Sequence, residues 1–166
     1  RLANYFPDVR RRAAELLGKV RTEQAKNALI TVLLNDDEPM VKAQAAYSLG
    51  ELGMNENNEV VAALVFAVDR EDHTRADNNW GYAMALAFEK LHQKTGGLKY
   101  PGAFRALVKI SQGNYLATGY LNRRSQIVVR LLTWDVEAGV DAAFWRGRLE
   151  RAIAALEEAI RIAEFY

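Results

Sequence analysis

Few side chains in this sequence are of types and spacings that could carry out chemistry. The most suggestive group surrounds His73, in an acidic run that also holds Asp69, Glu71, Asp72 and Asp77. An imidazole and several carboxylates could together bind a divalent cation. Their spacing matches no known ligand set, and two nearby arginines offset the acidic charge. We therefore expect a solvated loop and no metal site. The second histidine, His92, falls at the end of an expected helix, where a histidine commonly meets the helix dipole.

The short motifs of common catalytic and cofactor sites are absent from the sequence. It holds no HExxH, GxSxG, GxxxxGK or GxGxxG pattern. It also holds no cysteine, which excludes disulfides, cysteine metal sites and cysteine nucleophiles. A chain without cysteine fits the cytoplasm and the bacterial periplasm equally well. We therefore expect no catalytic residue and no cofactor, and the sequence favours a noncatalytic role.

Composition narrows the class of protein further. The chain has 166 residues, of which 50% are hydrophobic and 26% charged, with a formal net charge of +1. This length and apolar content suit one compact domain or one short repeat array with a real core. The balanced charge gives no strong attraction to nucleic acid or to an anionic membrane. No run approaches the roughly 18 apolar residues of a membrane-spanning helix.

A sequence repeat occurs twice in the first half of the chain and indicates which helices position the residues named so far. PDVRRRAAELLGKVR, residues 7–21, and PMVKAQAAYSLGELG, residues 39–53, align at a constant offset of 32 residues. The alignment pairs Pro7 with Pro39, Val9 with Val41, Ala13-Ala14 with Ala45-Ala46, and Leu17-Gly18 with Leu49-Gly50. We expect helix pairs over residues 7–20 and 23–35, then over residues 39–52 and 57–70. Thr22 should be an N-cap and Gly53 a left-handed C-terminal residue.

The expected core stripe of the first helix contains Val9, Ala13, Leu16, Leu17 and Val20, at spacings of three and four residues. A degraded third copy covers residues 78–112, with helices over residues 78–92 and 101–112. In it Trp80 takes the core position of Val41, and Glu89 replaces the repeat glycine. We thus expect one domain over residues 1–166, with clear repeats at 7–38, 39–72 and 78–112.

The last third of the chain, residues 113–166, departs from the repeat. A fourth first-position helix is expected around residues 125–132. A long amphipathic helix is expected over residues 141–165, where an apolar stripe runs from Trp145 to Ala163. Such a helix suits the polar-backed cap that a solenoid end requires. Its stripe could instead pair with a second copy, which would make the chain a homodimer.

The motif VxxxAAxxLGxL, followed by a turn, a helix that contains AL and an acidic turn, resembles HEAT-like repeats of the phycobilisome-lyase type. The resemblance covers roughly residues 7–112. It implies an all-α solenoid of three to four stacked antiparallel helix pairs, ending here in the long C-terminal capping helix. It also implies that the second helices line a concave face, where partners often bind. It does not imply lyase activity, because this is a packing motif.

Under that resemblance, outward positions of the second helices form columns on the concave face. One column holds Thr31, Phe66 and Lys109, and its neighbour holds Asn27, Ala62 and Arg105. An exposed aromatic side chain beside basic ones is a typical interaction anchor. We therefore predict that Phe66 anchors a protein or peptide partner, assisted by Asn27, Thr31, Arg105 and Lys109. Phe66 could instead pack beneath the loop at residues 69–79 or against the C-terminal helices.

Two enzyme classes are built on similar repeats and offer alternatives. Iron-binding hydroxylases of this class use paired His-Glu motifs, which the sequence lacks. DNA glycosylases of this class use tryptophans and an aspartate in a basic groove. The available residues are Trp80, Trp134, Asp135 and Trp145. The near-neutral charge argues against duplex binding, and Trp80 occupies a core position, so nucleic-acid binding or base excision remains the alternative function.

Overall fold

A computed structural model describes residues 6–72 and 78–111 of the chain. These residues form six α-helices and one short 3-10 turn, with no strand in the described ranges. The elements are α2 (Pro7–Leu17), α3 (Glu23–Asn35), α4 (Pro39–Leu52), η1 (Glu56–Asn58), α5 (Glu59–Arg70), α6 (Asn78–Thr95) and α7 (Pro101–Ser111). The predicted all-α class is confirmed.

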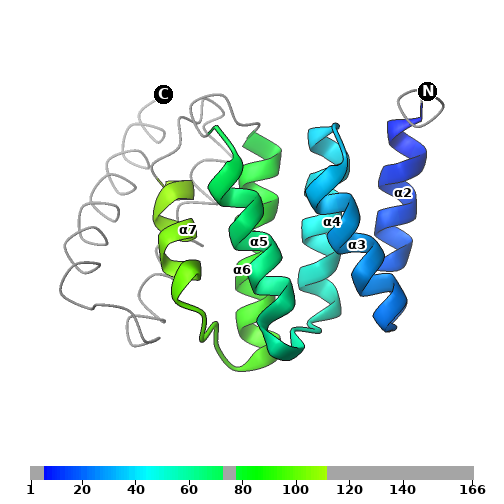
Figure 1. Ribbon diagram of the computed structural model, residues 1–166. Coiled ribbons are helices and arrows are strands. Elements are labelled where there is room, and N and C mark those ends of the chain that lie inside the picture. The colour runs from blue at the N-terminus through cyan, green and yellow to red at the C-terminus, as the bar shows by residue number, and fades with distance from the viewer. Residues whose placement is uncertain (1–5, 73–77, 112–166) are drawn as a thin grey trace, which may run out of the picture.

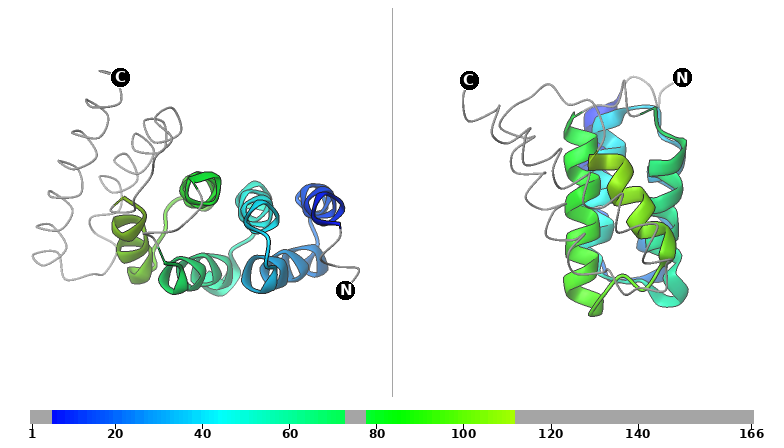
Figure 2. Two further views of the ribbon diagram at one scale, coloured as in Figure 1. Left: turned by 90° about the horizontal axis from the view of Figure 1, so that it is seen from above. Right: turned by 90° about the vertical axis from the view of Figure 1, so that its left-hand side faces the viewer.

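The helices form three antiparallel pairs stacked in two layers (Figure 1). Seen from above, α2, α4 and α6 stand side by side in the first layer, and α3, α5 and α7 form the second (Figure 2). A single helix pair cannot bury its apolar face alone, so each pair is completed by its neighbour. The predicted stacking of repeats is therefore confirmed for the described residues.

Local sequence signals set the helix ends. The hydroxyl of Thr22 accepts a hydrogen bond of 3.1 Å from the N–H of Ala25, as an N-cap does. Gly53 has a φ of 62° and ends α4 in the left-handed conformation. Helix α5 begins two residues later than expected, because Asn57 and Asn58 both have positive φ. The Oδ1 of Asn55 caps that helix instead, accepting from the first N–H groups of α5.

The first layer is held together by a seam of small residues. A Cβ placed on Gly18 would lie 2.8 Å from the Cβ of Ser48, and one on Gly50 would lie 3.0 Å from the Cα of Ala87. The Ser48 hydroxyl donates to the carbonyl of Ala14 at 2.9 Å, which ties α4 to α2. Larger side chains at these positions would push the helices apart.

The core lies between the two layers and follows the repeat pattern. Val41, Ala45, Ala46, Leu49 and Leu52 of α4 are all buried, and so is Trp80 of α6. The expected packing of Trp80 in the core is confirmed. The expected helices over residues 125–132 and 141–165 lie outside the described residues, as do His73, Trp134, Asp135 and Trp145.

The expected inward stripe of the first helix was wrong at four of its five positions, whereas Leu17 is partly buried and packs against the core as expected. Val9 is 63% exposed, Leu16 48% and Val20 47%, and α2 ends at Leu17 and not at Val20. Ala14 is the buried side chain of this helix. The four exposed residues are not covered by a described element, because α2 stands at the end of the described array with no described helix pair in front of it (Figure 2).

Candidate functional site

The residues predicted to bind a partner all lie on the second layer. Asn27 and Thr31 belong to α3, Phe66 to α5, and Arg105 and Lys109 to α7. Asn27, Thr31, Phe66 and Arg105 are exposed, whereas Lys109 is half-buried. The three helices lie side by side (Figure 1), so the predicted columns share one surface, here called the second-layer face.

Phe66 is the large apolar side chain of this face, with 55% of its surface exposed. It does not pack beneath another described element. Its ring lies under the guanidinium of Arg70, whose central carbon is 5.3 Å from the ring centroid. This cation–π contact adds modest stabilisation at an exposed site, about 0.5–1 kcal/mol. Phe66 and Arg70, one turn apart on α5, therefore present an aromatic surface beside a positive charge.

Arg105 and Lys109 do not reach Phe66, and instead hold the carboxyl end of α5. Arg105 donates to the carboxylate of Asp69, with a shortest distance of 2.6 Å. Lys109 donates to the backbone carbonyl of Asp69 at 2.6 Å and to that of Val68 at 3.2 Å. The hydrogen bond with Asp69 raises the pKa of Arg105. These two cations therefore lock α7 to α5, one turn beyond Phe66.

Thr31 and Asn27 contribute polar surface and no further anchor. The Thr31 hydroxyl donates to the carbonyl of Asn27 at 3.0 Å, within helix α3. The amide of Asn35 donates in turn to the carbonyl of Thr31 at 2.9 Å. Phe66 thus stands between a polar helix on one side and a basic helix on the other.

The opposite face, formed by α2, α4 and α6 and here called the first-layer face, carries two shallow depressions that the sequence analysis missed. Each has a volume of about 280 Å³, and they share Gln44 and Tyr47. The depression between α4 and α6 is mainly apolar, and is lined by Met40, Ala43, Gln44, Tyr47, Asn79, Tyr82, Ala83 and Leu86. The outward spacing of Met40, Gln44 and Tyr47 on one helix was the signal available in the sequence.

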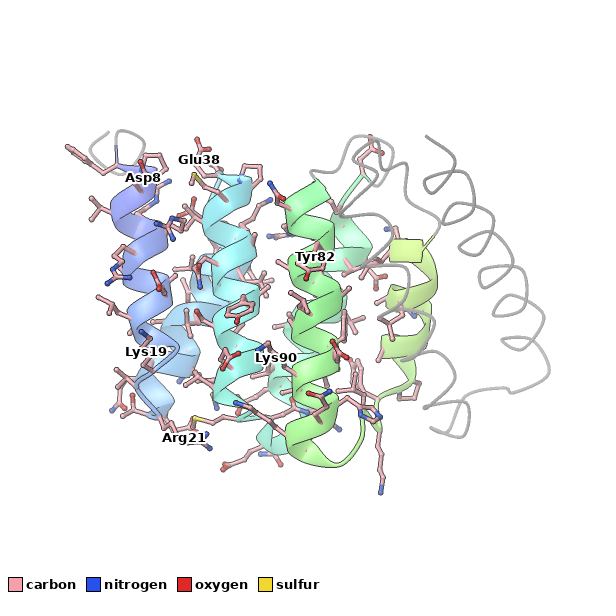
Figure 3. The ribbon with its side chains drawn as sticks, turned by 180° about the vertical axis from the view of Figure 1, so that it is seen from behind. Asp8, Lys19, Arg21, Glu38, Tyr82 and Lys90 are labelled. Carbon is pink, nitrogen blue, oxygen red and sulfur yellow. The ribbon has the colours of Figure 1, made fainter. Side chains whose placement is uncertain are left out.

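Five of the charged residues on the first-layer face lie where the helix dipoles favour them. Asp8 and Glu38 lie at the amino ends of their helices, whereas Lys19, Arg21 and Lys90 lie toward the carboxyl ends (Figure 3). Negative charge is favourable at the amino end of a helix and positive charge at the carboxyl end. This separation of charge is therefore explained by helix stability.

Between the two depressions, Lys90 lies over the ring of Tyr47, with its Nζ 4.7 Å from the centroid. The same ammonium pairs with Glu51. The hydrogen bond from Lys90 lowers the pKa of Glu51 more than burial raises it. Lys90, fixed by its ion pair with Glu51, therefore packs on the ring of Tyr47, which lies between the two depressions.

A buried lysine was also missed. Lys26 of α3 is 1% exposed, and its Nζ lies 2.7 Å from Glu23 and contacts Glu59 of α5. Hydrogen bonds with Glu23 and Glu59 raise the pKa of Lys26 despite its burial. This cluster joins one repeat to the next. The spacing of Lys26 to Leu29 and Leu33, three and seven residues, places it on the buried side of α3 and was the available signal.

No arrangement for catalysis emerges from residues 6–72 and 78–111. Within these ranges no group of three His, Asp or Glu side chains is placed to hold a metal ion. Trp80 is 2% exposed and so cannot stack on a nucleobase. None of the described helices is both long and apolar enough to cross a membrane. The surfaces described above are suited to binding.

Antiparallel helix pairs that stack on one another define a helical repeat protein. Residues 1–85 match the HEAT repeat family, and the chain therefore belongs to the HEAT repeat proteins. Residues 72–134 match a second family, described as a PUA-like domain. The described part of that range includes α6 and α7, which continue the helical array. No curated protein and no solved structure matches the chain.

Proposed function

We propose that this chain is a noncatalytic scaffold that binds a protein or peptide on the second-layer face. A HEAT repeat module is typically protein-binding. The observation that carries the site is the exposure of Phe66, at 55%, in a column whose other members are the polar Thr31 and Lys109. The family resemblance would make this face the concave one.

The chemistry of the face suggests the kind of segment that would bind. Phe66 offers apolar contact, while Arg70 and Arg105 supply positive charge on either side of it. A guanidinium has five N–H donors, so an arginine already paired on one edge can still bind a carboxylate. The best-fitting partner is a peptide with one large apolar side chain flanked by aspartate or glutamate. Asn27 and Thr31 would add polar contacts at its edge.

Selection from a displayed random peptide library tests this proposal directly. We expect the recovered peptides to share an apolar residue beside acidic ones, and to lose most of their affinity to the Phe66→Ala and Arg105→Glu variants. Tyr47→Ala, on the opposite face, is the matched control and should bind normally. Circular dichroism would check that each variant is folded. Undiminished binding by both second-layer variants would rule out this site, and loss through Tyr47→Ala alone would move it to the first-layer face.

The repeat subtype, the domain bounds and two alternative functions also belong to this proposal. The likeness to phycobilisome-lyase repeats is carried by the motif alone and brings no lyase activity. A single domain over residues 1–166, with residues 113–166 as its cap, is the arrangement that the repeat pattern favours. Nucleic-acid binding or base excision is the alternative function, and would be supported by a salt-dependent shift of DNA or by base-excision activity that is lost on changing Asp135. Self-association through the C-terminal helix would be detected by light scattering, as a change from two associated chains to one when the chain is truncated after Gly139.

A further inference from the structure

The outer face of α2 is an apolar seam at a place where this fold normally buries side chains. At the repeat offset of 32 residues, Val9, Ala13, Leu16 and Val20 correspond to Val41, Ala45, Ser48 and Leu52 of α4. The four residues of α4 are at most 2% exposed, because α4 uses them to pack against the preceding pair. Their counterparts at α2 are all exposed.

This seam has the spacing of a helix-pairing interface. Within α2, Val9, Ala13 and Leu16 follow one another at four and three residues, and Phe6 and Val20 continue this spacing just beyond the two ends of the helix. That alternation is the pattern by which two helices pack together along their length. It is also nearly symmetric about Ala13, so the seam is the same when read in either direction along the chain.

Another repeat of the same kind does not fit the seam well. In the α2–α4 contact, Ser48 lies so close to Gly18 that a Cβ on the glycine would approach it to 2.8 Å. Leu16 occupies the position of Ser48 and is much larger. A helix covering α2 must therefore stand further off, at the 8–10 Å axial separation usual for helices with larger contact residues.

The charges beside the seam favour a second copy of the same helix. Asp8 and Lys19 lie equally far from the midpoint between Ala13 and Ala14. Arg12 and Glu15 already pair with each other within the helix and do not contribute. Asp8 and Lys19 project on the same side of α2 (Figure 3). In a two-fold antiparallel pair, the same side of each helix meets. Asp8 would then lie near Lys19 of the other copy, whereas a parallel two-fold pair would bring opposite sides of the helices together and leave these two charges unmatched.

We propose that α2 is a self-association interface, through which two copies of this chain pair antiparallel about a two-fold axis near Ala13. The pairing buries Val9, Ala13 and Leu16 from both copies. It leaves the second-layer face with Phe66 open, so each dimer presents two partner-binding faces. It does not depend on the proposed partner or on the C-terminal residues.

Cysteine crosslinking tests the axis, because the chain has no cysteine of its own. Residues on a two-fold axis meet their own copies, within the Cα separation of less than about 7 Å that a disulfide requires. Ala13→Cys should form a covalent dimer under mild oxidation. Met40→Cys, also at an exposed position but on α4, is the matched control and should not. Equal crosslinking of both variants, or none at Ala13→Cys, would overturn the proposal.

Sedimentation equilibrium tests the charges. At a chain concentration of roughly 100 µM, which would populate a dimer with a Kd in the micromolar range, the mass should approach that of two chains. Leu16→Glu should reduce it to one chain, and Met40→Ser should leave it unchanged. Asp8→Lys or Lys19→Asp alone should weaken pairing about three- to tenfold, and the double exchange should restore it. A single-chain mass for the unaltered protein, or a double exchange as weak as the single changes, would refute antiparallel pairing.

Discussion

Lys26 provides the sharpest test of how the repeats are joined. Its side chain is 1% exposed, whereas those of Glu23 and Glu59 are 54% and 39% exposed. The ammonium is therefore buried and its two carboxylate partners are largely solvated. This difference predicts that removing the lysine and removing the carboxylates will have very different costs.

Lys26→Met replaces the lysine with an apolar side chain of similar length. The two carboxylates stay in water, so no buried charge is left without a partner. Substituting a buried ion by an apolar residue is often neutral or stabilising. We expect the free energy of unfolding to change by less than about 1 kcal/mol, since the pairs that are lost involve partly exposed carboxylates.

The double variant Glu23→Gln/Glu59→Gln keeps the shape and removes the negative charge. It leaves the ammonium of Lys26 buried without an ionised partner, which costs about 1–3 kcal/mol, less than in a fully buried pair because both carboxylates are partly exposed. The two changes thus differ in effect although both break the same contacts.

The same cluster predicts opposite pH dependences. The carboxylates raise the pKa of Lys26 above its ordinary value, so the stabilisation is complete at neutral pH and is lost as the pH rises through that raised pKa. In the double variant, burial should lower the pKa of Lys26 below its unfolded value. The unfolded chain then binds more protons than the folded one, and stability rises with pH.

Urea denaturation followed by circular dichroism, at pH values from 7 to about 10, measures both effects. Glu56→Gln, exposed in the η1 turn, is the matched control and should leave the midpoint unchanged. The reasoning fails if Lys26→Met costs as much as the double variant. It also fails if the double variant does not become relatively more stable at alkaline pH.

Three further predictions concern the packing of α4 and one ion pair. Ala46 is fully buried in the core side of α4. Ala46→Leu should overpack this position and lower the free energy of unfolding by about 1–3 kcal/mol, which a lower thermal midpoint would show. Gly50→Ala should also lower the thermal midpoint, because the added Cβ would lie 3.0 Å from the Cα of Ala87. In an exposed helix the same change would be stabilising by about 1 kcal/mol. A higher midpoint would therefore contradict the close approach of the two helices. Burial raises the pKa of Asp36, but hydrogen bonds from Arg10 and the backbone lower it overall. The stabilisation that ionised Asp36 gives the folded chain should therefore be lost as the pH falls below about 5. Asp36→Asn should make the free energy of unfolding, measured by urea titration, less dependent on pH in that range.

Much of the fold was predictable because its signals are local. The bounds of α3 and α4 agree with those expected from Thr22, Pro39 and Gly53, since caps and turn residues act within a few positions of themselves. The small-residue seam was also predictable, because Gly18 and Gly50 recur at the repeat offset. Only the stacking of repeats explains that recurrence.

Features that depend on a neighbouring repeat were not predictable in the same way. The stripe on α2 has the same periodicity as the one on α4, but periodicity does not say whether another helix covers it. The burial of Lys26 depends on Glu59, which is 33 residues away on another helix. A lysine among apolar residues of one helix gives no sign of that partner.

The columns of the second-layer face show why equivalent positions need not share a role. The last carbonyls of every helix lack a partner within the helix and must find one elsewhere. In this array the neighbouring elements supply it with cations: Arg21 donates to Leu52, Arg70 to Leu34, Lys94 to Glu51 and Lys109 to Asp69. A basic residue near the end of a repeat helix is therefore evidence of stacking before it is evidence of a ligand. An aromatic ring cannot cap a carbonyl, so the exposure of Phe66 has no such competing explanation, and it is the stronger indication of a binding site.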